Sequence, residues 1–206
     1  MSDPADDLAL LDYRRRVAGI YAGVRSRGVD EHGWRWWREQ RDELFAAHPA
    51  SPVPVDRRAA FPGLTYHAYD AALHLGEVAL EPAEPIVLQV AHSADGTTRA
   101  RRFAHLPLEF GGQVHRVSVY WLDVYGGGVF VPLRDATCGD STYGGGRYLL
   151  DTVKSADLGG DLERLVVDLN FLYHPSCVHD PQWSCPLASA DERLPVPVVG
   201  GERLPG

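Results

Sequence analysis

The sequence predicts a mainly β protein: an antiparallel β-barrel or sandwich-like domain with an N-terminal α-helical extension and an irregular, proline-rich C-terminal tail. Three observations support this fold class. Apolar residues recur at helical spacing before residue 50, short apolar runs follow, and the last thirty or so residues are rich in proline without any periodicity. We therefore expect a helical extension at 1–48, a proline-rich linker at 49–63, and a β-rich domain with its tail at 64–206.

The N-terminal part predicts two helices. Over 8–28, apolar residues recur at spacings of three and four, and Gly28 is a typical stop signal. The second helix is expected over 30–48 with Asp30 as its N-cap. It carries three closely spaced tryptophans, Trp34, Trp36 and Trp37. These indoles either clamp the helix onto the β core, stack a ligand, or form a contact with another protein, which includes a homo-oligomer of this chain.

Eight short segments rich in β-branched and aromatic residues predict strands. They are 64–69, 74–80, 85–91, 97–106, 114–123, 128–133, 147–153 and 164–170. Asp95-Gly96 and Gly111-Gly112 are turn signals between consecutive strands. Because no helical pattern separates the strands, an antiparallel barrel or sandwich is favoured.

Composition excludes several classes of function. The formal net charge of -8 lacks the basic surface that nucleic acid or an anionic membrane attracts. No stretch resembles a signal peptide or a membrane span, and three cysteines are too few and odd in number for a secreted disulfide scaffold. We expect a soluble cytoplasmic protein that takes no nucleic acid, no membrane and no cofactor.

The stretch CGDSTYGGGRYLLD, at 138–151, raises a question about its three consecutive glycines. A phosphate loop of the Walker type requires Gly-Lys-Ser/Thr and a following helix, and neither is present. The segment is instead expected to connect two strands, with glycines that adopt positive φ or let another backbone or a ligand approach closely.

Two interpretations of this loop remain open. Arg147 could present its planar guanidinium to a carboxylate or phosphate, with Asp135 or Asp168 orienting it. Alternatively, Arg147 and one of these aspartates form a buried ion pair that fastens the loop to the fold. The candidate ligand-binding residues are Asp135, Thr142, Tyr143, Gly145, Arg147, Asp168, Asn170 and Tyr173.

The same residues carry a family resemblance. FVPLRDATCGDSTYGGGRYL, followed by VVDLNFLYHPSC and the proline-rich end of the chain, resembles the C-terminal signature of the domain-of-unknown-function family 1684 (DUF1684) over about seventy residues. Weaker likeness extends over 34–204. The resemblance implies a β-rich domain and no assigned activity. It also implies that His174 and His179 stand where the family pattern has Asn and an aromatic residue.

The segment YHPSCVHDPQWSC holds four residues that can bind zinc, His174, Cys177, His179 and Cys185. Their spacing matches no standard zinc site, so we expect no metal. The cysteines could instead form a disulfide, which a reducing cytosol opposes, or anchor the tail as buried apolar groups. A fourth interpretation makes Cys177 a catalytic nucleophile activated by His174.

The sequence thus favours a small-molecule-binding enzyme whose polar pocket, which could bind an anion, lies between the Thr142–Arg147 loop and the Asp168–Cys177 segment. One alternative is a non-catalytic interaction or structural module in which these motifs lock the fold. The other is a hydrolase or transferase with a cysteine nucleophile.

Overall fold

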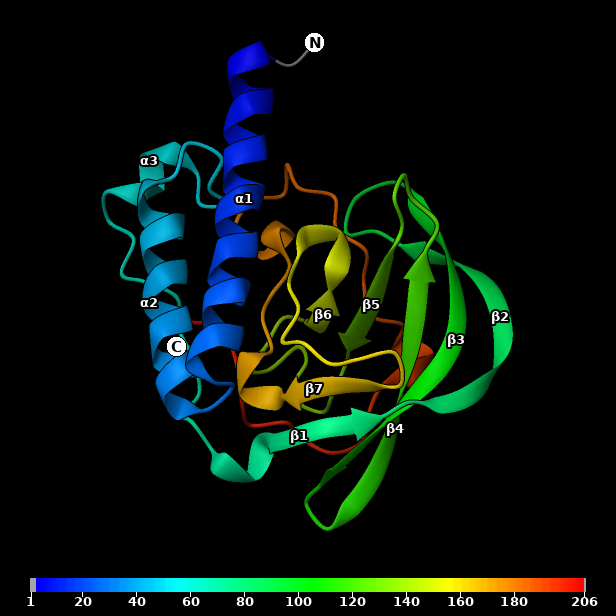
Figure 1. The fold of residues 1–206 in the computed structure, drawn as a ribbon. Coiled ribbons are helices and arrows are strands. Elements are labelled where there is room, and N and C mark those ends of the chain that lie inside the picture. The colour runs from blue at the N-terminus through cyan, green and yellow to red at the C-terminus, as the bar shows by residue number, and fades with distance from the viewer. Residues whose placement is uncertain (1–2, 206) are drawn as a thin grey trace.

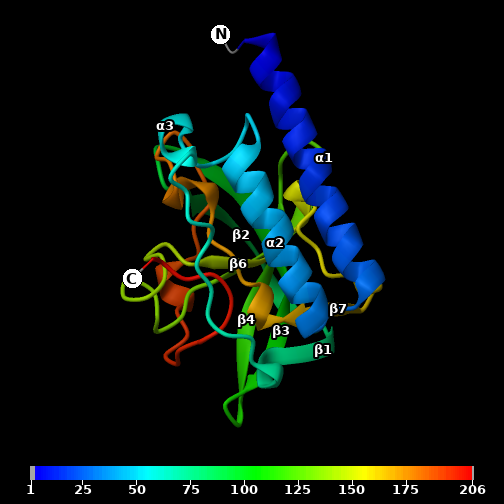
Figure 2. The same cartoon turned by 90° about the vertical axis from the view of Figure 1, so that its left-hand side faces the viewer.

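A computed structural model describes residues 3–205. Helices α1 (Pro4–Arg27) and α2 (Glu31–Ala47) lie side by side and cover one side of the β elements (Figures 1 and 2). The predicted capping residues are present. Helix α1 ends at Gly28, whose amide donates to the carbonyl of Val24, and α2 begins after Asp30, whose side chain accepts a hydrogen bond from the amide of Gly33. The helices do not stand apart, because their buried side chains share one core with the strands.

The strands form two antiparallel sheets. Their bounds are β1 (His74–Ala79), β2 (Glu81–Ala91), β3 (Thr97–Phe110), β4 (Gln113–Leu122), β5 (Gly128–Leu133), β6 (Arg147–Asp151) and β7 (Arg164–Asp168). Strands β2 to β6 pair in chain order, and β1 pairs with β7 in a separate two-stranded sheet. Since neither sheet closes on itself, the sandwich-like alternative is confirmed and the barrel alternative is wrong.

Seven of the eight predicted strands are confirmed, and both turn signals lie between paired strands. The prediction of a strand at 64–69 is wrong. Only Tyr66 forms a β-bridge there, to Glu202. The amide of His67 donates to Gly201 and the amide of Arg203 to Thr65, at 2.9 Å each. The partner of this segment is the irregular tail, which offers too few aligned groups for a strand.

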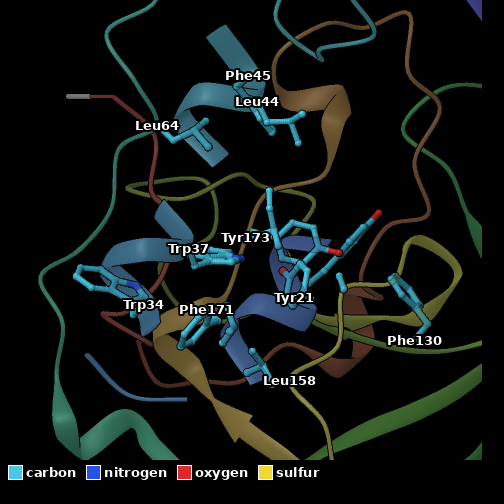
Figure 3. Close-up of a cluster of buried hydrophobic side chains, with 14 of the residues drawn as sticks. Tyr21, Trp34, Trp37, Leu44, Phe45, Leu64, Phe130, Leu158, Phe171 and Tyr173 are labelled. Carbon is cyan, nitrogen blue, oxygen red and sulfur yellow. The ribbon is translucent and has the colours of Figure 1, made fainter. Parts of the chain in front are cut away.

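Two apolar clusters fill the molecule. One lies between the helices and the five-stranded sheet (Figure 3). The other lies between the sheets and the tail and includes Leu106, Val131 and Leu169. A further short helix, α3 (Val55–Arg58), lies in the proline-rich segment. No helix within residues 3–205 is both long and apolar enough to cross a bilayer.

The tryptophans of α2 attach it to this core. Trp37 is fully buried, with its ring 5.1 Å from that of Phe171, and Trp34 donates through Nε1 to the carbonyl of Asn170 at 2.9 Å. Trp36 is half-buried against α1, under the guanidinium of Arg27. These positions fit the interpretation in which the indoles hold α2 on the β core. A contact between two copies of this chain through the tryptophans stays a prediction.

The three indoles predict different costs on truncation. Trp37→Ala should lower the free energy of unfolding by about 3–5 kcal/mol, the usual cost of removing a buried aromatic side chain. Trp36→Ala should cost about 1 kcal/mol, since it removes a half-exposed ring and one cation–π contact. Chemical denaturation of both variants measures the difference. Equal losses would show that Trp37 is not the anchor of α2.

Candidate functional site

Arg147 and Asp135 form a fully buried ion pair that holds the C-terminal tail. The Arg147 Nη2 to Asp135 Oδ2 distance is 3.3 Å, and both side chains are 0% exposed. Nη2 also donates to the carbonyl of Val198 at 2.9 Å, while Nη1 donates to the carbonyls of Gly200 and Glu202. Oδ2 of Asp135 accepts from the amide of Val198 at 2.6 Å. We call Asp135, Arg147 and residues 198–202 the C-terminal clasp.

The clasp leaves little of Arg147 for a ligand. Both terminal nitrogens of the guanidinium already donate to protein acceptors, and the side chain has no exposure. Burial lowers the pKa of Arg147, and the charge of Asp135 opposes that effect. This geometry is the one expected if the pair fastens the loop to the fold.

The polar loop before the glycines folds inward onto the clasp. The hydroxyl of Thr137 donates to Oδ1 of Asp135 at 2.7 Å and lies 2.8 Å from the hydroxyl of Thr142. Thr142 is fully buried, so it completes an internal network. The next residue, Tyr143, is partly exposed, and its amide donates to Nε2 of His174 at 3.2 Å.

The glycine triplet lets the tail approach this loop closely. Gly146 has a φ of 91°, and a Cβ there would lie 2.7 Å from the Cβ of Ala188 and 2.8 Å from the carbonyl oxygen of Leu133. A Cβ on Gly145 would lie 2.5 Å from the Tyr143 ring, whereas Gly144 has room. The amide of Ala188 donates to the carbonyl of Gly145 at 3.1 Å. The glycines therefore admit another stretch of backbone.

Asp168 and Asn170, at the end of β7, join this strand to the segment that contains Asp70. Oδ1 of Asp168 accepts from the amide and the side-chain nitrogen of Asn170, at 2.8 and 2.7 Å. Asn170 also exchanges two 2.9 Å hydrogen bonds with the backbone of Asp70. Burial raises the pKa of Asp168, and the hydrogen bonds from Asn170 and His74 lower it. Asp168 therefore pairs with His74 rather than with Arg147.

A second buried ion pair joins the tail to α2. Nη2 of Arg41 lies 2.6 Å from Oε2 of Glu202, and Nε of Arg41 donates to the hydroxyl of Tyr66 at 3.1 Å. The Arg41 guanidinium also lies over the rings of Trp37 and Tyr173. Burial alone would raise the pKa of Glu202, but the charge of Arg41 and the neighbouring imidazoles of His174 and His179 hold it well below its usual range.

The position of His174 argues against its role as a base for Cys177. Its Nδ1 lies 3.4 Å from Oε1 of Glu202, and its Nε2 accepts the amide proton of Tyr143. The two contacts fix the tautomer with the proton on Nδ1, so neither nitrogen is free to take a thiol proton. Within residues 3–205 no hydrogen bond joins His174 to Cys177. A catalytic pair of these two residues stays a prediction, and this structure does not show the contact that it requires.

The four zinc-competent residues separate into two pairs. His174 and His179 both face Glu202, with Nε2 of His179 3.6 Å from Oε1. Cys177 and Cys185 are free thiols, and Sγ of Cys177 lies 4.0 Å from the hydroxyl oxygen of Tyr143. The described part of the chain contains no cluster of three or more such residues arranged to hold a metal ion.

A cavity of about 260 Å³ lies beside these groups, between the two helices and the segment that starts at Tyr173. Its walls are mainly apolar and include Ile20, Leu44 and Phe45. Tyr173, His174 and Cys185 line it on the opposite side. The loop glycines and Arg147 do not contribute to its walls, so only part of the predicted pocket lies at this cavity.

The Lys and Arg side chains that line the cavity have no acidic counterpart in its described walls. Arg14, Arg41 and Lys154 contribute to its walls, and among the described residues that line it none is Asp or Glu. The hydroxyl of Tyr173 and Nε1 of Trp183 are buried and have no hydrogen-bond partner among residues 3–205. Unpaired buried donors are uncommon and costly, so these two require a partner.

Comparison with known proteins gives a family and a structural likeness. A family model described as a protein of unknown function (DUF1684) matches residues 59–203. The chain belongs to the DUF1684 family. This match covers more of the chain than the seventy residues of the C-terminal signature. None of the curated proteins matches the sequence.

An uncharacterized protein of Haloarcula marismortui, solved in solution by NMR, is similar in sequence and fold to this DUF1684 protein. The two chains are 30% identical, and the alignment covers 84% of this chain and 94% of the other, with a TM-score of 0.58. The likeness supports the fold and assigns no activity.

Sequence reasoning did not identify the importance of Arg41 and Glu202 in this DUF1684 chain. The signal for Arg41 was its position on the apolar face of the predicted second helix, where an arginine requires a buried partner. Glu202 lies in an irregular segment, and no local pattern marks a glutamate that is 1% exposed.

The glycine triplet provides a matched test of the close approach. Gly146→Ala should lower the free energy of unfolding by about 3 kcal/mol, from a strained positive φ and an overpacked contact. Gly144→Ala should change it by less than about 1 kcal/mol, since its Cβ has room. Thermal denaturation of both variants checks this, and equal melting temperatures would contradict the role given to Gly146.

Glu202→Gln should be strongly destabilising because it leaves the Arg41 charge without its partner. We expect a loss of about 3–5 kcal/mol at pH 7, the usual cost of breaking a buried pair. Glu31→Gln is the matched control: its 2.6 Å pair with Arg35 is exposed, so its loss should stay below about 0.5 kcal/mol.

The pH dependence of this difference has a definite sign. Because the folded pKa of Glu202 lies below its ordinary value of 4.5, the carboxylate contributes its full stability above that value. The contribution is lost as the pH falls through the folded pKa. The gap between wild type and Glu202→Gln in urea denaturation should therefore narrow below pH 4.5, and a gap that widens there would contradict the assignment.

Proposed function

We propose that the cavity binds a small, mainly apolar molecule that carries one carboxylate or a similar anionic acceptor. The observation that supports this most strongly is the charge of the walls: Arg14, Arg41 and Lys154 line the cavity, and none of the described lining residues is Asp or Glu, on a protein with a formal net charge of -8. Arg41 is already paired with Glu202, so Arg14 and Lys154 supply the excess positive charge. Lys154 is the only lysine in the sequence and lies in one of these walls. A local excess of positive charge attracts an anion and repels a cation.

The phenols around the cavity suit the same kind of ligand. Burial raises the pKa of Tyr21 to about 12 and that of Tyr13 further, although the nearby charge of Arg41 lowers both. Burial likewise raises the pKa of Tyr173. These tyrosines are therefore protonated at neutral pH and present O–H donors. The unpartnered hydroxyl of Tyr173 is the donor that a ligand oxygen would satisfy.

The size and shape of the cavity limit the ligand. Its volume of about 260 Å³ lies near the lower end of the range for ligand pockets, about 300–1,000 Å³. Aromatic and branched side chains form most of the walls. A short aromatic or branched carboxylic acid fits this description better than a nucleotide or a sugar, which need many more polar partners.

This proposal moves the site that the sequence predicted. The Tyr173–Ser176 stretch lines the cavity, whereas Arg147 lies in the clasp and Thr142 in the hydrogen-bond network beside it. Arg147 as an anion-binding residue remains an untested prediction that its burial does not favour. A non-catalytic module, in which these motifs lock the fold, is the second candidate, because the buried clasp is what that role requires.

Calorimetric titration with 3-phenylpropanoate, compared with 3-phenylpropan-1-ol, tests the proposal. The acid should bind more tightly than the alcohol. Lys154→Gln should lower the affinity for the acid about threefold to tenfold, since one charged contact is lost, and should leave the affinity for the alcohol nearly unchanged. Tyr173→Phe should lower the affinity for both compounds about fivefold, the effect of one lost hydrogen bond.

Arg101→Gln is the control, because this exposed arginine lies outside the cavity. It should bind both compounds as wild type does. Equal affinity for acid and alcohol, or an Arg101→Gln effect as large as that of Lys154→Gln, would reject the assignment to an anionic ligand. No binding of either compound would favour the non-catalytic module.

A further inference from the structure

A second cavity, of about 480 Å³, lies between the proline-rich segment and the last residues of the described chain. Its volume is within the usual range for a ligand pocket. Among the described residues that line the two cavities, His174 is the one they share. The apolar part of its walls consists of Val53, Phe61, Leu64, Val178 and Leu204, together with Ala60 and three prolines. We call this cavity the proline groove.

Hydrogen bonds hold the walls of the proline groove in place. The amide of Arg203 donates to the carbonyl of Thr65 at 2.9 Å, which joins the end of the described chain to the segment after the prolines. On the other side of these prolines, Nε of Arg58 donates to the carbonyl of Val53 at 2.8 Å. The groove is therefore built by segments whose positions the fold fixes.

The imidazole of His179 in this groove is held from two sides. Its Nε2 is buried and lies 3.6 Å from Oε1 of Glu202. Its ring meets that of Phe45 at a centroid distance of 5.2 Å and an angle of 79°. The backbone amide of His179 donates to the carbonyl of Ser176 at 3.0 Å, at the end of a 3-10 turn. Because a carboxylate can only accept, the neighbouring Nε2 carries the proton and Nδ1 keeps its lone pair.

Nδ1 is the accessible nitrogen of His179. The side chain is 17% exposed, and Nδ1 is neither enclosed nor hydrogen-bonded within residues 3–205. His174 faces the same carboxylate, but its Nε2 is already occupied by the amide of Tyr143. An imidazole with one nitrogen at a buried carboxylate and the other free is the arrangement of a general base. The 3.6 Å separation exceeds a hydrogen bond, and catalytic contacts of this kind often shorten when a substrate binds.

Two arginines add hydrogen-bond donors to the groove. Arg57 and Arg203 line it, and within residues 3–205 neither is in an ion pair. Its acidic residues are Asp56 and Glu202, and Glu202 is already paired with Arg41. Guanidinium N–H groups are strong donors to an oxygen that gains negative charge during a reaction. The groove thus combines a base, donors for an oxyanion and apolar walls for an acyl chain.

We propose that the proline groove hydrolyses small, apolar carboxylic esters, with His179 as the general base. Nδ1 of His179 takes a proton from a water molecule while the water oxygen attacks the ester carbonyl carbon, which gives a tetrahedral intermediate. The bond from this carbon to the alcohol oxygen then breaks, and the imidazolium gives its proton to the departing oxygen. The products are a carboxylic acid and an alcohol, and no oxidant or reductant takes part. Glu202 is a positioning residue, because it acts through the imidazole.

Hydrolysis of p-nitrophenyl butyrate by the full chain tests the groove. We expect release of p-nitrophenolate that saturates with ester concentration. His179→Gln should lower kcat/KM about a hundredfold, the usual contribution of a general base. Ala60→Trp places a large ring in the groove from an exposed position and should lower kcat/KM about tenfold or more. His32→Gln is the control, because this exposed histidine lies outside the groove, and it should hydrolyse the ester as wild type does.

Several results would overturn the assignment. A wild-type rate that does not saturate and equals that of free histidine at the same concentration would show that there is no site. Full activity in either His179→Gln or Ala60→Trp would place the reaction elsewhere. An acyl adduct on His179 in mass spectrometry would reject the water mechanism, and a Cys177→Ser variant as inactive as His179→Gln would assign the reaction to a cysteine nucleophile. Ala60 is exposed, so its variant remains informative if His179→Gln fails to fold.

Discussion

Two buried arginines hold one segment of the tail, and the rest of the structure depends on this constraint. Arg147 reaches residues 198–202 through backbone carbonyls, and Arg41 reaches the same segment through the carboxylate of Glu202. A buried charge without a partner is far more costly than a buried apolar group, so neither arginine tolerates a displaced tail. The pairs thereby select one arrangement of helices, sheet and tail, and add specificity more than net stability.

The cavity follows from that arrangement. The segment that carries Tyr173, Cys177 and Cys185 runs between two fixed parts, the bridge at Tyr148 and the pairing with the end of β2. Glu202 positions His174 from behind through the backbone amide and the ring. Polar and thiol groups are therefore presented along one side of the helix–sheet interface by an irregular chain. Such a segment depends on tertiary contacts for its order, since it has no helix or strand ladder of its own.

Much of the fold could be predicted because its determinants are local. The caps at Gly28 and Asp30, the turn at Asp95-Gly96 and the alternating strands are encoded within a few residues. Closure of a sheet is not local, so barrel and sandwich could not be separated, and 64–69 resembled a strand although its partner is irregular.

The candidate site was harder to predict from the sequence than the fold. The pattern around Arg147 left Asp135 and Asp168 open as its partner, and the pair forms with Asp135. A sequence does not tell whether such a guanidinium faces a ligand or three carbonyls. The cavity is formed by segments more than a hundred residues apart, for which no local pattern exists.

The clasp also has a consequence for synthesis on the ribosome. Residues 198–202 emerge after both arginines and nearly all of their surroundings, so the growing chain must keep Arg41 and Arg147 hydrated until this segment arrives. The helices and the hairpins can form earlier, but the two sheets and α2 cannot close over these charges without the tail. The nascent intermediate is therefore expected to stay open, along the surface that later becomes the cavity wall, until residues 198–202 have left the ribosome.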